Sequence, residues 1–595
     1  MNRIIEINGP IVRIEVDDAH IGEQVEVGEL KLIGEIIVLE GKEAIVQVYE
    51  STVSLRPGDK VNTLGYPLSV ELGPGLLGQI FDGTQRPLQT IAELHGSFIP
   101  RGLRLASLDR AKVWSFMVTE ELSAGQYLKG GEIIGTVQET SLIQHKILVP
   151  ADIQGELLEL APSGDYNIEK TIGRVRRPNG EIHKLRLFHR WPVRKARPFS
   201  HRLRSSEPLL TGQRILDTFF PLLKGAKAAV PGPFGAGKTM VQHQIARWSN
   251  ADVVIYVGCG ERGNELVDIL KSFPELVDPN SGRPLMERTL IIANTSNMPV
   301  VGREASIYVG ITLAEYFRDQ GMDVVILADS TSRWAEALRE VGGRLGHMPV
   351  EEGYPAYLAS RLSAFYERAG HVKALCGANG SVSLIGAVSP PGGDFSEPVT
   401  THTKEIIQTF WALSKELADA RHYPSIDWNS SFSEHISEAS RWWAKHISPL
   451  WLQRRDLAMS LLAQESELSR MVNLVGPEAL SSEQRWVMES AAMIREGILQ
   501  QSALDEADSY SSAQKQFLLL DLVLTLYQKG AQLVDIGVPV QHLSRLPLIS
   551  QIKRLKSQYR SEETEKLELF RNEINKIMNN IHSEYESSIS ERAEA

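Results

Sequence analysis

The sequence contains very little cysteine, since only Cys259 and Cys376 occur among its 595 residues. Two cysteines cannot build the disulfide framework of a small secreted protein, so we expect a reducing compartment. The first residues lack an apolar segment of signal-peptide length, and no charge-free apolar run reaches the roughly 18 residues that a membrane span requires. The formal net charge of −11 disfavours wholesale nucleic-acid binding. We therefore expect no transmembrane segment, and any role at a membrane would depend on partner proteins.

The distribution of turn residues and apolar runs divides the chain into several modules. Short β-rich segments separated by Gly, Pro and Asp fill the first part, and helical periodicity follows residue 430. Between them, almost entirely apolar strands alternate with helices, which is typical of a parallel sheet covered on both faces. We predict a multidomain α/β chain with an N-terminal β-barrel at 1–72, a connector at 73–95, a β-rich module at 96–195, an α/β domain at 196–430 and a C-terminal helical domain at 431–595.

The strongest motif occupies residues 232–239. It matches the phosphate-binding pattern G-x-x-x-x-G-K-[ST] and consists of Gly232, Pro233, Phe234, Gly235, Ala236, Gly237, Lys238 and Thr239. A predicted strand precedes it and a predicted helix follows, so loop amides and the positive end of the helix would face phosphate oxygens. In this pattern Lys238 reaches the β- and γ-phosphates, and the Thr239 hydroxyl ligates Mg²⁺. The alternative is a glycine turn before a structural helix.

Two further predicted strands end in polar residues. Asp329 closes the apolar strand 324–328, where a nucleotide hydrolase places a carboxylate on the metal side. Glu261 and Arg262 follow the strand 253–257, whose carboxyl end would open onto the ligand crevice of a parallel sheet. A carboxylate there can polarise the attacking water, and an arginine can stabilise phosphate charge. The simpler alternatives are an aspartate that caps a turn and a surface ion pair.

One charge cluster favours a different function. Eleven Lys and Arg residues lie between positions 174 and 204, against one acidic residue, Glu181. Basic patches can follow nucleic acid, but this cluster is mixed with apolar strand residues, so we predict a solvated, subunit-facing surface. The two cysteines, His435 and His446 have no candidate metal ligands nearby and are interpreted as structural residues.

Together, these motifs resemble the catalytic A subunit of vacuolar- and archaeal-type rotary ATPases over essentially the whole chain. The most specific stretches are 231–239, 258–265 and 328–340, and 353–355 and 389–398 extend the match. The resemblance implies that 196–430 is a P-loop RecA-like domain. It also implies that 96–195 is the β-rich insertion that separates these A subunits from the shorter β subunits of ordinary ATP synthases.

The resemblance assigns roles residue by residue. Lys238 and Thr239 would bind phosphate and Mg²⁺, and Asp329 would hold the water shell of the metal. Glu261 would activate water, and Arg262 would contact the γ-phosphate. A separate pair concerns the base: Tyr423 matches an aromatic residue that packs on adenine, and Phe234 would lie near the same pocket.

The sequence departs from the family pattern at three places. Ala236 replaces a cysteine of many eukaryotic relatives, so thiol-based inhibition at the loop should be absent. Leu504 stands where the family usually offers a phenylalanine to adenine, which concerns nucleotide affinity and not the type of reaction. The segment 476–483 resembles the acidic lever loop that faces the rotor, but it carries only two carboxylates.

The resemblance also implies cofactors, partners and a location. ATP or ADP and Mg²⁺ would bind at an alternating A3B3 ring, in which B subunits supply an arginine finger. A central rotor stalk and peripheral stalks would contact the ring and link it indirectly to a membrane ion-translocating sector. The chain would thus be a peripheral component at the cytoplasmic face of a membrane. ATP synthesis and hydrolysis both remain open, as do proton and sodium coupling.

Three other functions share parts of this pattern. A ring-shaped RNA translocase would carry an RNA-binding module before its ATPase core, which the acidic charge and the long insertion disfavour. A secretion-system ATPase would be shorter and would lack the insertion. A nucleotide-binding structural component of the same ring would usually lose Lys238, Thr239 or Glu261, and all three are present here.

Overall fold

The structure, a computed structural model, describes residues 2–96, 98–120, 122–278 and 281–594. The chain forms two units. Unit 1 contains Met1–Ser205, Lys224–Gly232 and Ala251–Ile407, and unit 2 contains the remaining segments, Ser206–Leu223, Pro233–Asn250 and Gln408–Ala595. The phosphate-loop segment thus belongs to the same unit as the C-terminal helices, whereas we predicted that it belongs to an α/β domain at 196–430. The predicted domain boundaries themselves stay a prediction.

The first part of unit 1 is an antiparallel β-barrel. Six strands pair in the order β1-β2-β5-β4-β3-β6. Their bounds are Arg3–Asn8 (β1), Ile11–Glu15 (β2), Glu23–Val27 (β3), Leu32–Glu40 (β4), Glu43–Val48 (β5) and Val61–Pro67 (β6). A backbone bond of 2.9 Å from the Ile4 amide to the Asp59 carbonyl connects the first strand to the residues before the last. Alternate apolar side chains such as Val25 and Val27 fill the interior, as a period of two requires.

A second β-rich module follows the helix α1 (Leu88–His95). Two four-stranded sheets have the orders β12-β11-β9-β14 and β10-β13-β15-β16. The strands are Val113–Val118 (β9), Tyr127–Leu128 (β10), Ile133–Gln138 (β11), Gln144–Leu148 (β12), Gly155–Leu160 (β13), Gly164–Asn167 (β14), Gly173–Arg176 (β15) and Ile182–Leu185 (β16). The module returns to the N-terminal region through β17 (His189–Pro192), which pairs with β7 (Ser69–Leu72). Both predicted β-rich modules are therefore confirmed as β structure.

The basic cluster at 174–204 is not simply a solvated face. Arg194 donates to Glu35 at 2.8 Å and to Glu304 at 2.8 Å, and Arg197 donates to Asp319 at 2.6 Å. Other arginines of the cluster form more exposed pairs with carboxylates of unit 1. The sequence interpretation missed the partners of Arg194 and Arg197 because these carboxylates lie more than a hundred residues away along the chain.

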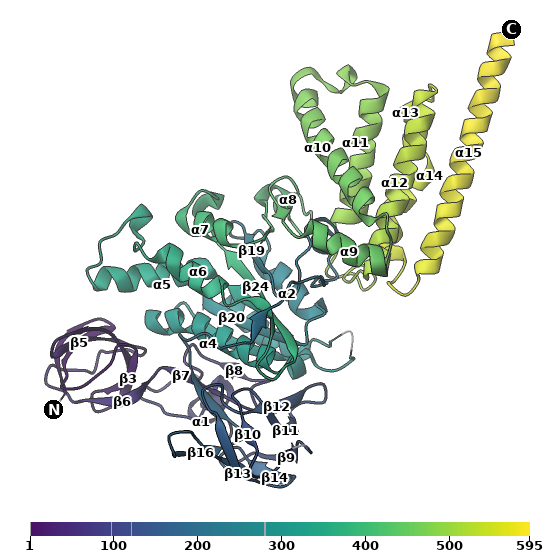
Figure 1. The fold of residues 1–595 in the computed structure, drawn as a ribbon. Helices are drawn as coiled ribbons and strands as arrows, with labels where there is room; N and C mark the ends of the chain where they lie inside the picture. Colours follow the sequence, from purple (N-terminus) through teal and green to yellow (C-terminus); the bar gives the residue numbers. More distant parts are fainter. Residues whose placement is uncertain (1, 97, 121, 279–280, 595) are drawn as a thin grey trace. The chain divides into compact units, whose positions relative to one another are not determined.

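The centre of unit 1 is a parallel sheet (Figure 1). The strand order is β19-β24-β22-β20-β21-β8. Their bounds are Lys227–Pro231 (β19), Asn379–Val388 (β24), Asp323–Asp329 (β22), Val253–Glu261 (β20), Thr289–Thr295 (β21) and Ile80–Phe81 (β8). At the side of β24, β23 (Gly370–Lys373) pairs antiparallel and joins β18 (His201–Arg202). The predicted parallel-sheet core is confirmed.

Helices cover this sheet because its strands are apolar on both faces. The longest, α4 (Val300–Asp319), packs against β20, β21, β22 and β24. The others are α3 (Gly263–Glu275), α5 (Thr331–Arg344), α6 (Leu358–Tyr366) and α7 (Pro398–Ile406), with short helical turns at Leu285–Arg288, Glu351–Gly353 and Pro391–Gly393. The α7 helix begins where the Glu397 side chain accepts bonds from the Val399 and Thr400 amides.

Unit 2 combines the phosphate-loop helix with a bundle of C-terminal helices. It contains η1 (Ile215–Phe219), α2 (Lys238–Trp248), the strand pair β25 (Thr409–Phe410) and β26 (Phe432–Ser433), α8 (Lys415–Asp419), α9 (Ile436–His446), α10 (Trp451–Val475), η5 (Pro477–Ala479), α11 (Ser482–Ile494), η6 (Arg495–Leu499), α12 (Ala513–Asp535), α13 (Val540–Ser544), α14 (Pro547–Gln558) and α15 (Thr564–Glu594). A capping box formed by Ser481 and Gln484 starts α11. The predicted C-terminal helical domain is confirmed.

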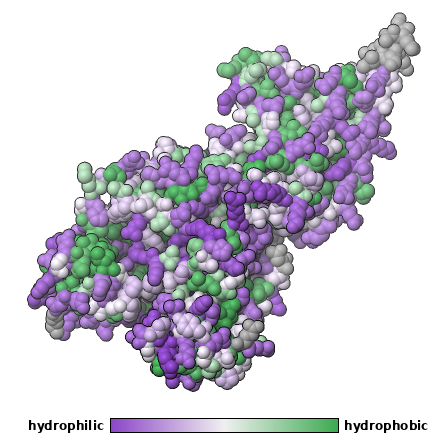
Figure 2. All heavy atoms as spheres, viewed as in Figure 1, coloured by the Kyte–Doolittle hydropathy of each residue, from purple (hydrophilic) through white to green (hydrophobic). Residues whose placement is uncertain are grey.

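One described helix, α12, is long and apolar enough to cross a membrane. Most of its apolar stretch is buried, and its central Asp521 accepts hydrogen bonds from Arg454 on α10, at 2.7 Å, and from Arg571 on α15. The visible face of the C-terminal helices is largely hydrophilic (Figure 2). Since the core helix of a bundle can have the same composition as a membrane span, α12 is weak evidence for one.

A buried arginine holds the segment 206–223 to the C-terminal part of unit 2. Arg214 is fully buried and pairs with Asp508 at 2.7 Å. Its guanidinium also donates to the Ile498 carbonyl at 2.8 Å, the Gln500 carbonyl at 2.8 Å and the Ser511 hydroxyl at 2.7 Å. All of these acceptors belong to residues 498–511, so the guanidinium is a specific link within unit 2.

Replacing Asp508 by alanine should destabilise the protein, because the buried charge of Arg214 would lose its partner. We expect Asp508→Ala to cost about 3–5 kcal/mol and to lower the melting temperature. The control is Glu506→Ala, which removes an exposed pair with Arg560 and should cost no more than about 1 kcal/mol. Equal thermal melts of the two variants would contradict this role of Arg214.

Candidate functional site: a phosphate loop and two strand-end carboxylates

The phosphate loop connects β19 to α2 and folds its lysine back over the loop. Gly235 and Gly237 have φ values of 79° and 88°, a left-handed conformation that glycine adopts without strain. The chain then enters α2 at Lys238, whose Nζ donates to the Pro233 carbonyl at 3.0 Å. This turn directs backbone amides and the positive end of α2 toward the same space, which suits an anion such as phosphate.

A shallow pocket lies beside this loop, within unit 2. It is lined by residues of the loop, of α2 and of other segments of the unit: Gln213, Leu216, Ala236, Gly237, Met240, Val241, Gln244, Tyr423, Pro424, Ser425, Gln501 and Ala503. The Ser425 hydroxyl donates to the Ala236 carbonyl at 2.5 Å, and the Gln501 amide donates to the Tyr423 carbonyl at 2.8 Å. These bonds hold Tyr423, whose side chain is 44% exposed, next to the phosphate loop, and its contact with adenine stays a prediction.

Two residues that the sequence places near the base are more exposed. Phe234 is 70% exposed and Leu504 is 95% exposed, and neither lines the described pocket. Leu504 is therefore not a core residue. Its neighbour Ala503 lines the pocket instead, together with Met240 and Gln244, none of which carried a sequence signal. Contact between Leu504 and adenine remains a prediction.

The two strand-end carboxylates lie in unit 1. Asp329 ends β22, which pairs with β20 so that Gly258 lies opposite Asp329, and Glu261 ends β20. The Tyr256 hydroxyl, which is buried, donates to Asp329 Oδ2 at 3.0 Å. Parallel pairing therefore brings both carboxylates to the carboxyl edge of the sheet, where ligands of open α/β sheets bind.

The environment of Glu261 favours a proton on its side chain. Burial, the negative charge of Asp329 and the neighbouring Glu265 raise the pKa of Glu261 to about 9, and Arg333 opposes this shift. A carboxyl group with such a shift at a ligand-binding edge is a candidate for proton transfer. Two arginines that the sequence analysis missed adjoin this turn: a Cβ atom on Gly260 would lie 2.7 Å from the Arg303 side chain and 3.1 Å from that of Arg333.

The surroundings of Arg262 and of the two cysteines complete the description of the residues singled out in the sequence. Arg262 precedes the first turn of α3 and is exposed. Cys259 is buried, and burial raises the pKa of its thiol to about 12, which fits a structural residue. Cys376 donates to the Asp319 carbonyl at 3.1 Å.

The two residues predicted to hold Mg²⁺ are of the donor types that this ion accepts. Mg²⁺ prefers oxygen ligands and is usually held by one or two carboxylates together with substrate phosphates. Asp329 is a carboxylate and Thr239 a hydroxyl, so each is an oxygen donor, and their role toward Mg²⁺ stays a prediction. Among the described residues there is no cluster of three or more His, Cys, Asp or Glu side chains that could hold a metal ion without phosphate.

Fold and site together define a phosphate-loop nucleotide-binding protein with a β-barrel before and a helical domain after its parallel sheet. Family models match the same order: the ATP synthase alpha/beta family beta-barrel domain at 4–65, its barrel-sandwich domain at 105–194, its nucleotide-binding domain at 212–433, and the C-terminal domain of V and A type ATP synthase at 440–542.

Similar proteins cover nearly the whole chain. The V-type ATP synthase alpha chain of Nitrosococcus oceani is 62% identical over 98% of this chain and 99% of its own length. The A subunit of the A-type ATP synthase of Thermococcus kodakarensis is 52% identical over 98% of this chain and 100% of its own length. A solved structure, the assembled ATPase EscN of the type III secretion system of enteropathogenic E. coli, has a TM-score of 0.62. It is 21% identical and covers 88% of this chain and 100% of its own, so it shows a shared fold alone.

The chain belongs to the family of V-type and A-type ATP synthase A (alpha) subunits. This confirms the predicted family and its activity, the hydrolysis or synthesis of ATP coupled to ion translocation. ATP and ADP are accordingly its nucleotides.

The exposed position of Leu504 permits a clean test of its predicted contact with adenine. A phenylalanine there cannot overpack a core, so we expect Leu504→Phe to leave the melting temperature unchanged. If the side chain reaches the base, ATP should bind about three- to tenfold more tightly, as an aromatic contact of about 0.5–1.5 kcal/mol implies. Calorimetric titration measures this affinity, with Leu569→Phe on α15, also an exposed leucine, as the matched control. An affinity equal to that of the control would exclude Leu504 from the adenine site.

Proposed function

We propose that the residues of the phosphate loop and of the two strand ends carry the ATP chemistry of this chain. The residues are Lys238 and Thr239 of the loop, Glu261 at the end of β20 with Arg262 after it, and Asp329 at the end of β22. The observation that carries the proposal is the arrangement of Glu261 and Asp329 at one sheet edge, in a chain that also carries a complete phosphate loop.

The phosphate end of the nucleotide is bound by groups of the loop. The backbone amides of the loop and the positive end of α2 stabilise the negative charge of the phosphates, and Lys238 contacts the β- and γ-phosphates. Arg262 stabilises the charge that develops on the γ-phosphate during transfer. On the base side, Tyr423 covers one face of adenine, while Ala236 and Ala503 leave room for the ring.

Glu261 orients and deprotonates the attacking water. In the structure its pKa of about 9 keeps Glu261 protonated near pH 7, so it must first release this proton to solvent water before it can accept one from the attacking water. Mg²⁺, held by the Thr239 hydroxyl and by Asp329 through water, would neutralise phosphate charge and favour the carboxylate form of Glu261. Tyr256 fixes Asp329 through its hydrogen bond, so that the carboxylate keeps one orientation.

Relatives that cover the full chain are subunits of multisubunit ATP synthases, so the chain is one part of a complex. We extend this to an alternating A3B3 ring in which B subunits supply an arginine finger. Such a finger contributes on the order of 10³–10⁵ in rate. A central rotor stalk, peripheral stalks and, indirectly, the ion-translocating membrane sector are the further partners. The chain would thus act as a peripheral component at the cytoplasmic face of a membrane.

The alternatives have less support. An RNA translocase would need nucleic-acid contacts, whereas several arginines of the 174–204 cluster already pair with carboxylates. A secretion ATPase is favoured only by a shared fold at 21% identity. A purely structural component of the ring would not need a carboxyl group with a raised pKa at the strand end.

Glu261→Gln in the assembled complex tests this function. The amide has the shape of the protonated acid and cannot accept a proton from water, so turnover should fall about 10²-fold or more while ATP binding is kept. Steady-state ATPase assays and ATP titration measure the two quantities. Glu275→Gln, an exposed residue at the end of α3, is the control and should retain full turnover. Near-normal hydrolysis by the Glu261 variant would remove this residue from its role.

A further inference from the structure

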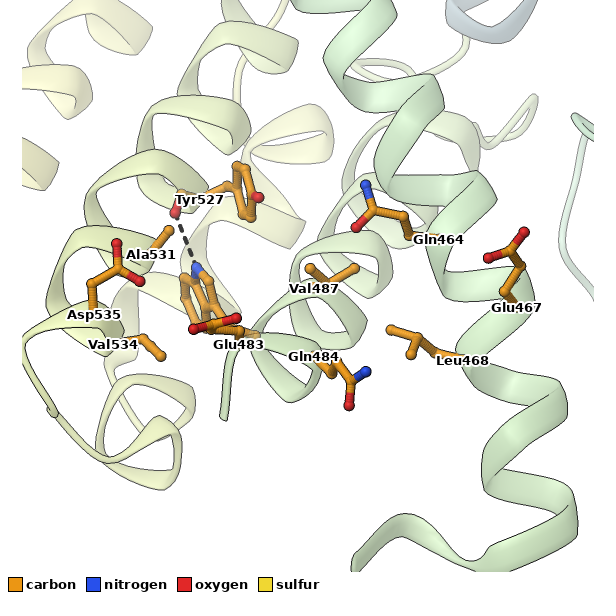
Figure 3. A pocket seen from close by; sticks show the side chains of 11 residues that line it. Gln464, Glu467, Leu468, Glu483, Gln484, Val487, Tyr527, Ala531, Val534 and Asp535 are labelled. Atoms are coloured by element: carbon orange, nitrogen blue, oxygen red, sulfur yellow. Dashed lines mark hydrogen bonds between the residues drawn. The ribbon is translucent and has the colours of Figure 1, made fainter. Parts of the chain in front are cut away.

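A buried polar group without a partner often marks a functional place in a fold. In the groove between α10, α11 and α12 of unit 2, the buried indole is satisfied, because Trp486 Nε1 donates to the Tyr527 carbonyl at 2.9 Å (Figure 3). The turn that carries Glu261, in unit 1, is different. Arg303 of α4 packs against this turn, and its Nε is buried and has no hydrogen-bond partner among the described residues.

A one-residue bulge in β20 sets the direction of the Glu261 side chain. Cys259 lies opposite Asn294 of β21, and Glu261 lies opposite Thr295, the next residue of that strand, so Gly260 is the extra residue. Paired residues share a face of the sheet and successive residues of β21 alternate, so Glu261 lies on the face opposite to Cys259. In a regular strand, residues 259 and 261 would lie on the same face. The bulge therefore decides which face carries the Glu261 side chain.

The bulge depends on a glycine that lies against an arginine. Gly260 has a φ of 70°, in the left-handed region that glycine adopts without strain. A Cβ atom on Gly260 would lie 2.7 Å from both Cδ and Nε of Arg303 and 3.1 Å from Arg333 Cβ. The stem and guanidinium of Arg303 thus occupy the space beside Gly260, so the turn cannot shift toward α4.

Hydrogen bonds connect the same arginine to both sides of the bulge. Arg303 Nη2 donates to the Ser296 carbonyl at 3.1 Å, and the Ser296 amide donates to the Glu261 carbonyl at 2.9 Å. Before the bulge, the Cys259 thiol donates to the Arg303 carbonyl at 3.4 Å. Arg303 is therefore bonded to Cys259 directly and to the backbone of Glu261 through Ser296.

We propose that Arg303 is a positioning residue for the reaction, which holds the bulge at Gly260 so that the Glu261 carboxyl group keeps one direction toward the attacking water. This inference rests on the proposed role of Glu261. Arginine suits the task because its planar guanidinium can lie over Gly260 and donate to the Ser296 carbonyl at the same time, whereas lysine carries a single ammonium on a flexible stem. The packing of Arg303 Nε against Gly260 also explains why this nitrogen has no partner.

Two variants of Arg303 in the assembled complex test the proposal. Arg303→Lys keeps the charge and most of the stem, Arg303→Met removes the charge, and neither can reproduce both contacts of the guanidinium. Each should lower kcat about tenfold or more, because a small misplacement of a reacting group slows the reaction strongly, while ATP affinity changes less than about twofold. Steady-state assays and ATP titration measure the two quantities. Arg344→Lys, at an exposed position of α5 that pairs with Glu340, is the matched control and should retain full turnover. Full turnover of Arg303→Lys, or an equal loss of kcat and ATP affinity, would overturn the proposal.

A double variant shows whether Arg303 acts through Glu261. When Arg303→Lys is combined with Glu261→Gln, which lacks the base, turnover should stay within about twofold of that of Glu261→Gln alone, because a positioning residue has nothing left to position. A further loss of about tenfold in the double variant would show that Arg303 acts elsewhere and would overturn its role. Normal turnover of Glu261→Gln itself would remove the proposed function and this inference together, whereas a slow Glu261→Gln beside a fast Arg303→Lys would remove only the role of Arg303.

Discussion

The parallel register between β20 and β22 is the constraint on which the carboxylate half of the site depends. Both strands are buried along most of their length, so their charged side chains can occur only where the strands end. The register sets Gly258 opposite Asp329, and Glu261 follows three residues later at the same edge. The burial that forces this arrangement also raises the pKa of Glu261, because a second carboxylate in a poorly solvated place disfavours another charge. Burial of the two strands is thus the common cause of the position of these carboxylates and of the raised pKa of Glu261.

Local signals in the sequence were sufficient to predict the main elements of the fold and part of the candidate site. The loop at 232–239 and the apolar strands that end in Asp329 and Glu261 are contiguous patterns, and a contiguous pattern requires no knowledge of long-range contacts. Tyr256, Arg303 and Arg333 gave no such signal, since their closeness to Asp329 or Gly260 follows from strand register and helix packing. The grouping of the phosphate-loop segment with residues 408–595 depends likewise on contacts between residues far apart in the sequence.

Among the features of the sequence, the pattern of charged residues predicted the structure least well. The basic run at 174–204 suggested a solvated face, yet Arg194 and Arg197 are satisfied by Glu35, Glu304 and Asp319, which a linear sequence cannot pair with them. At the pocket beside the phosphate loop, Ala503 belongs to the described lining and had no signal in the sequence, while the contact of Leu504 with adenine stays a prediction. In both cases the sequence suggested which type of residue matters but did not show which residues it contacts, because tertiary packing decides those contacts.

The central proposal is that Thr239 of the phosphate loop and the carboxylate Asp329 both act on Mg²⁺–ATP. A double-mutant cycle with Thr239→Val and Asp329→Asn, read out as Mg²⁺–ATP affinity by calorimetry in the assembled complex, tests it most directly, with ATP in the absence of Mg²⁺ as the reference. The account predicts a coupling energy of at least about 1 kcal/mol, because either substitution alone already disrupts the shared ion. Additive effects, within about 0.3–0.5 kcal/mol, would contradict it by showing that the two residues act on separate sites.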